Sequence, residues 1–280
     1  NKQHTAALLG KRGTQVLYVE SVGLRAPSAS SGKDWSRLGK RLVTGLRSLL
    51  MGPKHVQTNV WVLSPLVIPF KHDHTWVRWF NQNLLRLQIT LFIAFRELKN
   101  PLIWTYHPFM LDVLKGMSKG KLVYHCVDDL SAVPGIDAKA FKAEEIRLLQ
   151  QVDVVFVTAP ALAEHCAQYN RNTHYLSNVV DAEHFGRALD IGPIPKDLAS
   201  IPEPRIGYHG VLSDYKIDFQ LLLNIAKLHP EWSFVFIGEE REGQNSPLVL
   251  ELLRLPNVHF LGYRRYEILP DYLRGFQIGL

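Results

Sequence analysis

The chain has 280 residues, a formal net charge of +6 and 46% hydrophobic residues. This composition supplies a packed core and excludes a disordered protein, and the length predicts two domains or one large α/β unit. Cys126 and Cys166 have neither the number nor the spacing of a disulfide framework or a zinc site. Such cysteine usage favours a reducing compartment.

Charge is distributed unevenly along the chain. Residues 1–100 contain 15 Lys and Arg against four acids, a net of 15 − 4 = +11. The remainder contains 17 against 22, a net of −5, and the two halves sum to +6. A basic front half predicts an anionic partner, for which nucleic acid and acidic lipid headgroups both qualify on charge alone.

Short apolar runs alternate with helical patterns through the first 170 residues. The runs are almost continuously apolar, as strands covered on both faces should be. Five strands are predicted at 14–20, 60–65, 101–106, 121–126 and 153–158. Helices are predicted at 3–12, 36–50, 76–98, 108–117, 137–151 and 160–169.

The helical pattern at 76–98 is too often interrupted by polar residues to cross a membrane. Two interpretations remain for it. It is either a core helix of the first domain or an amphipathic helix that rests on a bilayer through Trp76, Trp79 and nearby cations.

A proline-rich stretch at 191–204 predicts a linker, after which the alternating pattern restarts. The sequence therefore predicts an α/β protein with two tandem Rossmann-like domains, 1–190 and 205–280. Residue 3 already has a helical pattern and the last strand begins at 276, so we expect the first domain to lack its opening strand and the second to be truncated. In the second domain, strands are predicted at 205–210, 233–238, 258–263 and 276–280, and helices at 218–229, 246–255 and 267–275.

Four segments, taken in order, resemble glycosyltransferases that use nucleotide sugars and have the GT-B fold. The first resembles the opening helix and second strand of the acceptor domain, and the second a "PNGVDxxxF" segment. The other two resemble the start of the donor domain and its "V-x-F-L-G" segment. The segments are "HTAALLGKRGTQVLYVE", "SNVVDAEHF", "YHGVLSDYKIDFQLLLNIAKLHPEWSFVFIGEE" and "NVHFLGYRRYEILPDYL". The pattern is most similar to bacterial group 1 transferases that build surface polysaccharides, in which a "Y-x-C-V-D-D" strand end is typical.

The resemblance implies an enzyme that moves a sugar from a UDP- or GDP-sugar to a lipid-linked or polysaccharide acceptor, with retention favoured. It implies no cofactor and no bound metal. A cytoplasmic protein held peripherally at the inner face of the cell membrane is expected, because the acceptors lie there and the front half is basic. A nucleotide-sugar epimerase of the same fold and a non-enzymatic basic protein that binds nucleic acid or membrane remain as alternatives. Nucleic acid is not the expected partner, because no nucleic-acid-binding motif is present.

In the second domain, the loop after the first strand would hold the donor diphosphate. Such loops often read G-R-L-x-x-x-K-G, which places Gly210 at the glycine and Lys216 at the lysine, but Val211 where an arginine is expected. Two phosphates call for fixed cations and backbone N–H groups. His209 or Arg264 would have to compensate for the missing arginine.

Two further positions in the second domain are candidate donor contacts. Glu239 follows the next strand together with Glu240, and Tyr263 lies where the resemblance places a nucleobase contact. An exposed acidic loop explains the glutamates equally well. A pair of glutamates eight residues apart, which the resemblance predicts for the donor sugar and ribose, would fall beyond residue 280.

In the first domain, "YHCVDDL" at 124–130 is the candidate active-site segment. Its strand delivers the loop to the carboxyl edge of a parallel sheet, where open α/β folds bind ligands. We expect His125 and one aspartate to serve the sugar and the other aspartate to cap a helix start. Asp129 is the predicted substrate-facing residue and Asp128 the cap. His107 follows a neighbouring strand and is a further candidate, with a plain loop residue as the alternative.

Overall fold

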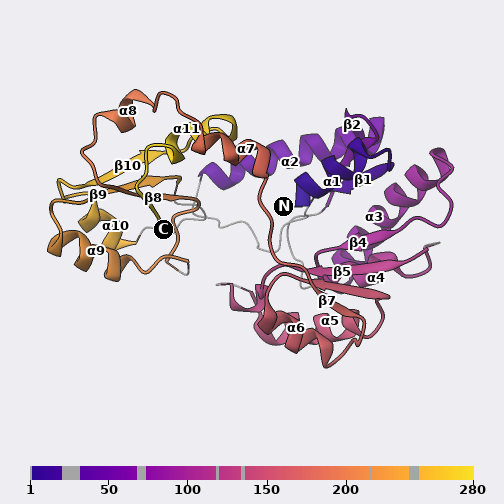
Figure 1. The fold of residues 1–280 in the computed structure, drawn as a ribbon. Coiled ribbons are helices and arrows are strands. Elements are labelled where there is room, and N and C mark those ends of the chain that lie inside the picture. Colours follow the sequence, from indigo (N-terminus) through magenta and orange to yellow (C-terminus); the bar gives the residue numbers. More distant parts are fainter. Residues whose placement is uncertain are drawn as a thin grey trace. The chain divides into compact units, whose positions relative to one another are not determined.

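The computed structural model describes residues 2–20, 32–67, 74–117, 120–133, 136–214, 216–239 and 246–280. By their internal contacts these residues form two compact units, Asn1–Asn178 and Val179–Leu280 (Figure 1). Each unit contains parallel sheet and helices, which confirms the predicted α/β class.

The first unit contains two sheets. The smaller has the order β1-β3-β2, with β1 (Val16–Val19) parallel to β3 (Val60–Leu63) and β2 (Lys54–Gln57) antiparallel to it. The larger is wholly parallel and has the order β4-β5-β6-β7. Its strands are β4 (Ile103–Thr105), β5 (Leu122–Cys126), β6 (Val154–Val157) and β7 (Thr173–Tyr175).

Helices cover both sheets of the first unit. On the smaller sheet Leu63 packs with Leu85 of α3, and α1 also contacts β1 and β3. The larger sheet buries one face against α4, α5 and α6, with Tyr124 and Leu148 in that core (Figure 1). The elements are α1 (Lys2–Lys11), α2 (Gly32–Met51), α3 (Thr75–Phe95), η1 (Pro108–Met110), α4 (Leu111–Leu114), η2 (Leu130–Ala132), α5 (Ala138–Leu149) and α6 (Pro160–Ala167).

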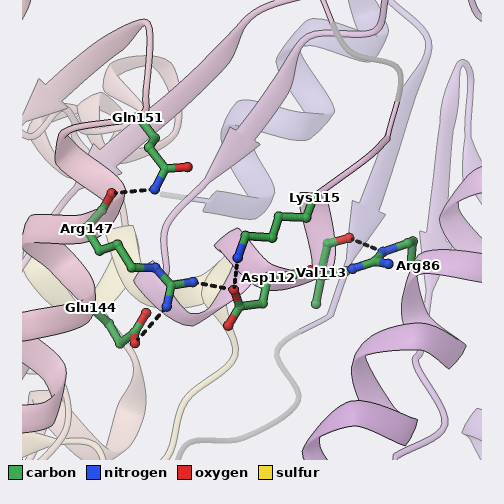
Figure 2. A network of polar contacts seen from close by, with 7 residues as sticks. All are labelled: Arg86, Asp112, Val113, Lys115, Glu144, Arg147 and Gln151. Carbon is green, nitrogen blue, oxygen red and sulfur yellow. Dashed lines mark hydrogen bonds and ion pairs between the residues drawn. The ribbon is translucent and has the colours of Figure 1, made fainter.

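An ion network ties α3, α4 and α5 together (Figure 2). The Asp112 carboxylate pairs with Arg147 and with the Lys115 ammonium at 3.3 Å, and Arg147 also binds Glu144 at 3.2 Å. Arg86 of α3 donates to the Val113 carbonyl oxygen at 2.9 Å and to the Asp112 carbonyl at 2.5 Å. A cation on these carbonyls satisfies groups that α4, as a one-turn helix, leaves unpaired at its C-terminus.

The second unit has a single parallel sheet of order β10-β9-β8-β11. One face packs Phe234 and Phe236 of β9 against α9 and α10, and the other packs Val235 and Ile237 against α8 and α11 (Figure 1). The strands are β8 (Arg205–His209), β9 (Ser233–Ile237), β10 (Val258–Gly262) and β11 (Ile278–Gly279). The helical elements are α7 (Ala182–Gly186), η3 (Arg187–Leu189), α8 (Lys196–Ala199), α9 (Phe219–Leu228), α10 (Pro247–Leu252), η4 (Tyr266–Ile268) and α11 (Leu269–Leu273).

The proline-rich stretch 191–204 packs onto the second unit, although its composition predicts a linker. Leu198 and Ile201 are buried beside Val235 and Tyr272. Leu198 lies in α8 and Ile201 just beyond its end, where the Ile201 N–H donates to the Leu198 carbonyl at 3.0 Å, and both side chains reach the same core. The second compact unit, Val179–Leu280, therefore includes this stretch.

The predicted strands and the longer helices all occur, most of them a few residues shorter than expected. β2 and β7 were not predicted, because "KHVQ" and "THY" lack a continuous apolar run. Across the helices that the structure describes, none combines the length and the hydropathy needed to span a bilayer.

Candidate active site

The first candidate site lies at the carboxyl edge of the β4–β7 sheet. β4 and β5 are adjacent and parallel, with Thr105 opposite Tyr124, so the segments that follow them emerge side by side. The Thr105 hydroxyl accepts a bond from the His107 backbone N–H at 3.1 Å and donates to the His107 carbonyl at 3.0 Å. This pair of bonds fixes the turn that carries His107, as serine and threonine hydroxyls do in turns.

The structure assigns the cap to Asp129, whereas the sequence predicts Asp128 for it. Asp129 is the N-cap of η2, and its carboxylate accepts from the Ser131 N–H at 3.0 Å and from the Ser131 hydroxyl at 2.5 Å. Asp128 instead lines a hollow. The sequence could not distinguish them, because either aspartate can begin the turn and only the backbone path determines which carboxylate points back to it.

The hollow beside Asp128 has a volume of about 490 Å³. The Lys2 ammonium contributes a cation and lies 4.8 Å from the centre of the Tyr106 ring. Burial lowers the pKa of Lys2, and the nearby Asp128 carboxylate opposes that shift. The hollow therefore combines a lysine and a carboxylate with hydrogen-bonding side chains from α1 and β1. Its lining residues are Lys2, Gln3, His4, Tyr18, Val127, Asp128 and Asn178.

Both predicted histidines are neutral near pH 7. Burial, followed by repulsion from Lys2, lowers the pKa of His107 to about 4 and also lowers the pKa of His125. In the part of the chain that the structure describes, His107 Nε2 and His125 Nδ1 are buried without a hydrogen-bond partner. A neutral imidazole can donate from one nitrogen and accept at the other, so each ring has hydrogen-bonding capacity that the described residues do not satisfy.

Beneath this edge, a buried polar cluster supports β5. The Tyr124 hydroxyl donates to Glu145 Oε1 at 2.6 Å, and Glu145 Oε2 lies 3.3 Å from His165 Nε2. Tyr124 and His125 occupy opposite faces of the strand, because successive side chains alternate. A hydrogen bond with Cys166, together with burial, raises the pKa of the Cys126 thiol, so Cys126 is an unreactive core residue.

The second candidate site lies at the carboxyl edge of the second sheet, where a glycine follows β8 and β9 and another ends the adjacent β10. Gly210, Gly238 and Gly262 have φ values of 156°, 147° and 71°. The Gly210 N–H donates to the Ile237 carbonyl at 2.9 Å, and the Gly238 N–H to the Gly262 carbonyl at 3.0 Å. A Cβ at Gly238 would lie 1.8 Å from the Gly210 carbonyl oxygen. Glycine is therefore required at Gly238 by close backbone packing against Gly210, and the strand ends at this edge carry little side-chain bulk.

The other predicted donor contacts lie on the segments that leave these strands. Burial of part of the His209 ring lowers its pKa, and Phe185 packs edge-on to it with ring centres 6.0 Å apart. Lys216 and Glu239 are exposed, as is Tyr263, whereas Glu240 lies outside the described residues. The Lys216 N–H donates to the Ser213 carbonyl at 2.9 Å, which fixes the backbone of that turn.

Arg264 does not supply the missing arginine. Its guanidinium binds the Asp197 carboxylate at 2.6 Å and the Tyr272 hydroxyl at 2.6 Å. Burial tends to raise the pKa of Asp197, but the bonds from Arg264 and Tyr272 outweigh it and lower that pKa. Arg264 therefore anchors α8 to α11, and His209 remains as the compensating candidate.

Lys2 is the functional candidate that sequence reasoning missed. It precedes the first predicted helix, where no strand gives it a place on a sheet edge. The signal that could have found it is a cation at the start of a helix that packs on the opening strand.

Two Rossmann-like units in tandem, the second with a glycine-lined edge, define the GT-B fold, which solved structures share. Sucrose-phosphate synthase from Thermosynechococcus elongatus matches 95% of this chain and 74% of its own, with a TM-score of 0.64 and 15% identity. Anabaena Alr3699/HepE in complex with UDP and glucose matches 95% and 73%, with a TM-score of 0.58 and 15% identity. An α,α-trehalose 6-phosphate synthase from Burkholderia multivorans matches 94% and 74%, with a TM-score of 0.55 and 13% identity.

One similarity extends to the sequence. The chain is 25% identical over 173 residues to the "Putative teichuronic acid biosynthesis glycosyltransferase TuaH" of Bacillus subtilis (strain 168). The matched region covers 57% of this chain and 43% of the relative, so the chain spans less than half of the relative's length. No protein-family model matches the chain.

Proposed function

We propose that the protein is a glycosyltransferase that moves a hexose from a UDP- or GDP-sugar to a lipid-linked or polysaccharide acceptor. The observation that carries the proposal is the glycine-lined edge formed by Gly210, Gly238 and Gly262 on a GT-B fold. Two comparisons support it. HepE has been solved with UDP and glucose, and the B. subtilis relative is named for teichuronic acid biosynthesis.

In this proposal the second unit holds the donor. The diphosphate would approach the backbone at Gly210 and Gly238, which carry no side chain. Lys216 supplies a positive charge to the phosphates. Val211 stands where an arginine is expected, and His209 offers a ring N–H to the phosphates in its place. Tyr263, which is 56% exposed after β10, offers a ring face or edge to the nucleobase, and Glu239 offers a carboxylate to ribose or sugar hydroxyls.

The first unit would supply the groups around the transferred sugar. The C1–O bond to the diphosphate breaks and the nucleoside diphosphate leaves with the bonding pair. The acceptor oxygen then bonds to C1 and gives up its proton. Neutral His107 and His125 bind sugar hydroxyls without adding charge. Asp128 orients the acceptor hydroxyl, and we propose a retaining outcome in which the leaving phosphate takes the proton.

We place the activity at the inner face of the cell membrane, in a cytoplasmic protein. The net charge of +11 over residues 1–100 supports this location, because anionic lipids attract basic segments. Lipid-linked sugar acceptors reside at the same surface.

Calorimetry with UDP-glucose, GDP-mannose and the free nucleotides tests the donor site. Lys216→Ala should weaken binding of the preferred donor by about 1.5–3 kcal/mol, the range for a charged hydrogen bond. Lys227→Ala is the matched control, because Lys227 is an exposed lysine of the same unit that lies 3.9 Å from Glu251. Unchanged affinity in Lys216→Ala with an intact fold would remove Lys216 from the site.

Product analysis separates the proposal from its alternatives. A transferase releases nucleoside diphosphate only as labelled sugar appears in the acceptor, and NMR of the new linkage reports retention or inversion. An epimerase would convert the nucleotide sugar to its isomer without an acceptor. Absence of binding to every nucleotide would leave a non-enzymatic basic protein.

A further inference from the structure

Helix α3 (Thr75–Phe95) is apolar both on its buried side and over much of its exposed side. Its inner side buries Val77, Leu85 and Phe92. Its outer side exposes large apolar side chains, including Trp79 at 64%, Leu87 at 53% and Phe95 at 84%. A helix that is apolar all round normally lies inside a protein or in lipid, so the outer side of α3 requires a covering surface.

The outer side is a continuous, uncharged stripe. Its positions follow steps of three and four residues, so they lie on one face of the helix over its whole length. The other members that point the same way, Asn83, Thr90 and Ala94, are small or neutral. The large members, here called the α3 stripe, are Trp76, Trp79, Phe80, Leu87, Leu91 and Phe95.

Cations occur beside the α3 stripe but not in it. Arg78 is exposed on another side of the first turn, and Lys99 is exposed just beyond the C-terminus. The sequence of α3 contains no Asp or Glu, and Glu97 is the single acid between 74 and 99. Tryptophan on an uncharged face with flanking Lys and Arg is the composition of helices that lie at the boundary between lipid headgroups and acyl chains.

We propose that the α3 stripe is the surface through which the protein docks on an anionic lipid bilayer. α3 would lie in the plane of the membrane, with the stripe in the acyl boundary and Arg78 and Lys99 at the phosphates. The inference refines the membrane partner proposed above, but vesicle binding does not require sugar transfer. A failure of one test therefore leaves the other standing.

Charge favours a bilayer over a second copy of the chain. A symmetric dimer through α3 would bring together two regions that each carry +11 over residues 1–100. Like charges across an interface oppose association, whereas the same excess is attracted to acidic headgroups. A nucleic acid would need cations interleaved among the aromatic residues, and the stripe has none within it.

The test is co-sedimentation of the protein with vesicles of phosphatidylcholine alone or with about 30% phosphatidylglycerol, at low salt and at about 0.5 M NaCl. We expect binding to the anionic vesicles that weakens with salt. Trp79→Asp and Leu87→Asp should each reduce it by about tenfold or more, because each removes an apolar contact and adds repulsion. Leu87→Ser, which adds no charge, should reduce it by a smaller factor.

Two control variants make the result specific to α3. Leu228→Asp changes a leucine of the second unit that is 74% exposed and should bind like the parent protein. Leu50→Asp changes an exposed leucine at the end of α2, a second basic amphipathic helix, and should retain most binding. Circular dichroism checks that each variant is folded.

Several results would overturn the proposal. These are no binding to anionic vesicles, binding that the α3 variants do not change, or loss of binding in Leu50→Asp alone. A concentration-dependent dimer that Trp79→Asp and Leu87→Asp dissociate would assign the stripe to a second copy. Binding of an oligonucleotide that the same variants abolish would assign it to nucleic acid.

Discussion

The carboxyl edge of the β4–β7 sheet and the carboxyl edge of the second unit's sheet differ in composition. One presents polar side chains and the other presents backbone. In the first unit, the β4–β5 edge presents side chains, with His107, His125 and Asp128 close to Lys2. In the second unit, the β8–β10 edge presents backbone, because Gly210, Gly238 and Gly262 leave it without side chains. The topology that brings ligands to a sheet edge is shared, and only the residue type at the strand end differs.

This difference matches two different chemical tasks. Side chains with adjustable protonation suit hydroxyl groups and proton movement. Bare backbone suits a bulky, highly charged group that must approach the sheet closely. Under the function proposed above, the polar side chains at the first edge would serve the reacting group and the glycines at the second edge would serve the phosphates.

The largest expected effect is at Gly238. Gly238→Ala would place a Cβ 1.8 Å from the Gly210 carbonyl oxygen, at a φ of 147°. Both the clash and the conformation oppose the substitution, so we expect a loss of about 3 kcal/mol or more of stability in the second unit and loss of donor binding. Urea unfolding followed by Trp232 fluorescence, with calorimetry for the donor, measures both.

Gly186→Ala is the matched control for this prediction. Gly186 ends α7 with a helical φ of −56°, and a methyl group added there would have no neighbour within 4 Å. The substitution should be neutral or slightly stabilising, because alanine restricts the unfolded chain. If both glycine variants behave alike, the backbone edge is not a specialised feature.

The second prediction separates the two aspartates of the first unit. Asp128→Ala should retain the melting temperature and reduce sugar transfer by about a hundredfold, the scale of a positioned acid–base or hydroxyl-binding group. Asp129→Ala should retain near-normal transfer and lose about 1 kcal/mol of stability, because Ser131 loses its cap. The reverse pattern would restore the assignment that the sequence suggested.

Much of this fold can be predicted from the sequence, because strands buried on both faces of a parallel sheet are continuous apolar runs. "KLVYHC" and "DVVFVT" are nearly continuous apolar runs and become β5 and β6. The short edge strand β7 and the helices at 182–199 have no such run. They form because neighbouring strands and the core at Leu198 supply partners that a local window does not contain.

The candidate site is only partly readable, for a related reason. A strand end fixes which residues reach the edge, so His107, His125 and Gly210 can be selected from the pattern alone. The direction of a loop carboxylate and the partners of a distant side chain depend on tertiary contacts. Asp129 rather than Asp128 forms the cap, and Arg264 binds Asp197, for reasons that no local spacing contains.

The third prediction concerns the pH dependence of the first unit. The pKa of His107 is about 4 in the folded chain, below its ordinary value, because burial disfavours the charged ring. Between about pH 6.5 and 4 the unfolded chain binds more protons, so stability falls as the pH decreases through this window. In His107→Gln, the loss of unfolding free energy between about pH 6.5 and 4 should be smaller by about 1–3 kcal/mol. Thermal denaturation at a series of pH values measures this loss. The control His74→Gln, at an exposed position, should retain the slope, and an equal slope in both variants would exclude His107 as its source.

The smallest predicted effect tests how the side-chain edge is supported from below. Asp112 pairs with Arg147 of α5, the helix that also carries Glu145 and Phe141, the partners of Tyr124 and His107. Asp112→Asn removes the charge and keeps the size of the side chain. We therefore expect the free energy of unfolding to fall by about 0.5–1 kcal/mol at low salt and by less at high salt.

Arg86→Met removes hydrogen bonds to the Asp112 and Val113 carbonyls. Its cost in unfolding free energy should depend less on salt, because those carbonyls lose their partner. Equal salt dependence in the two variants, measured by urea unfolding, would show that charge alone joins α3 to α5. The ion pairs beneath the edge that carries His107 and His125 would then weaken with ionic strength as surface ion pairs do.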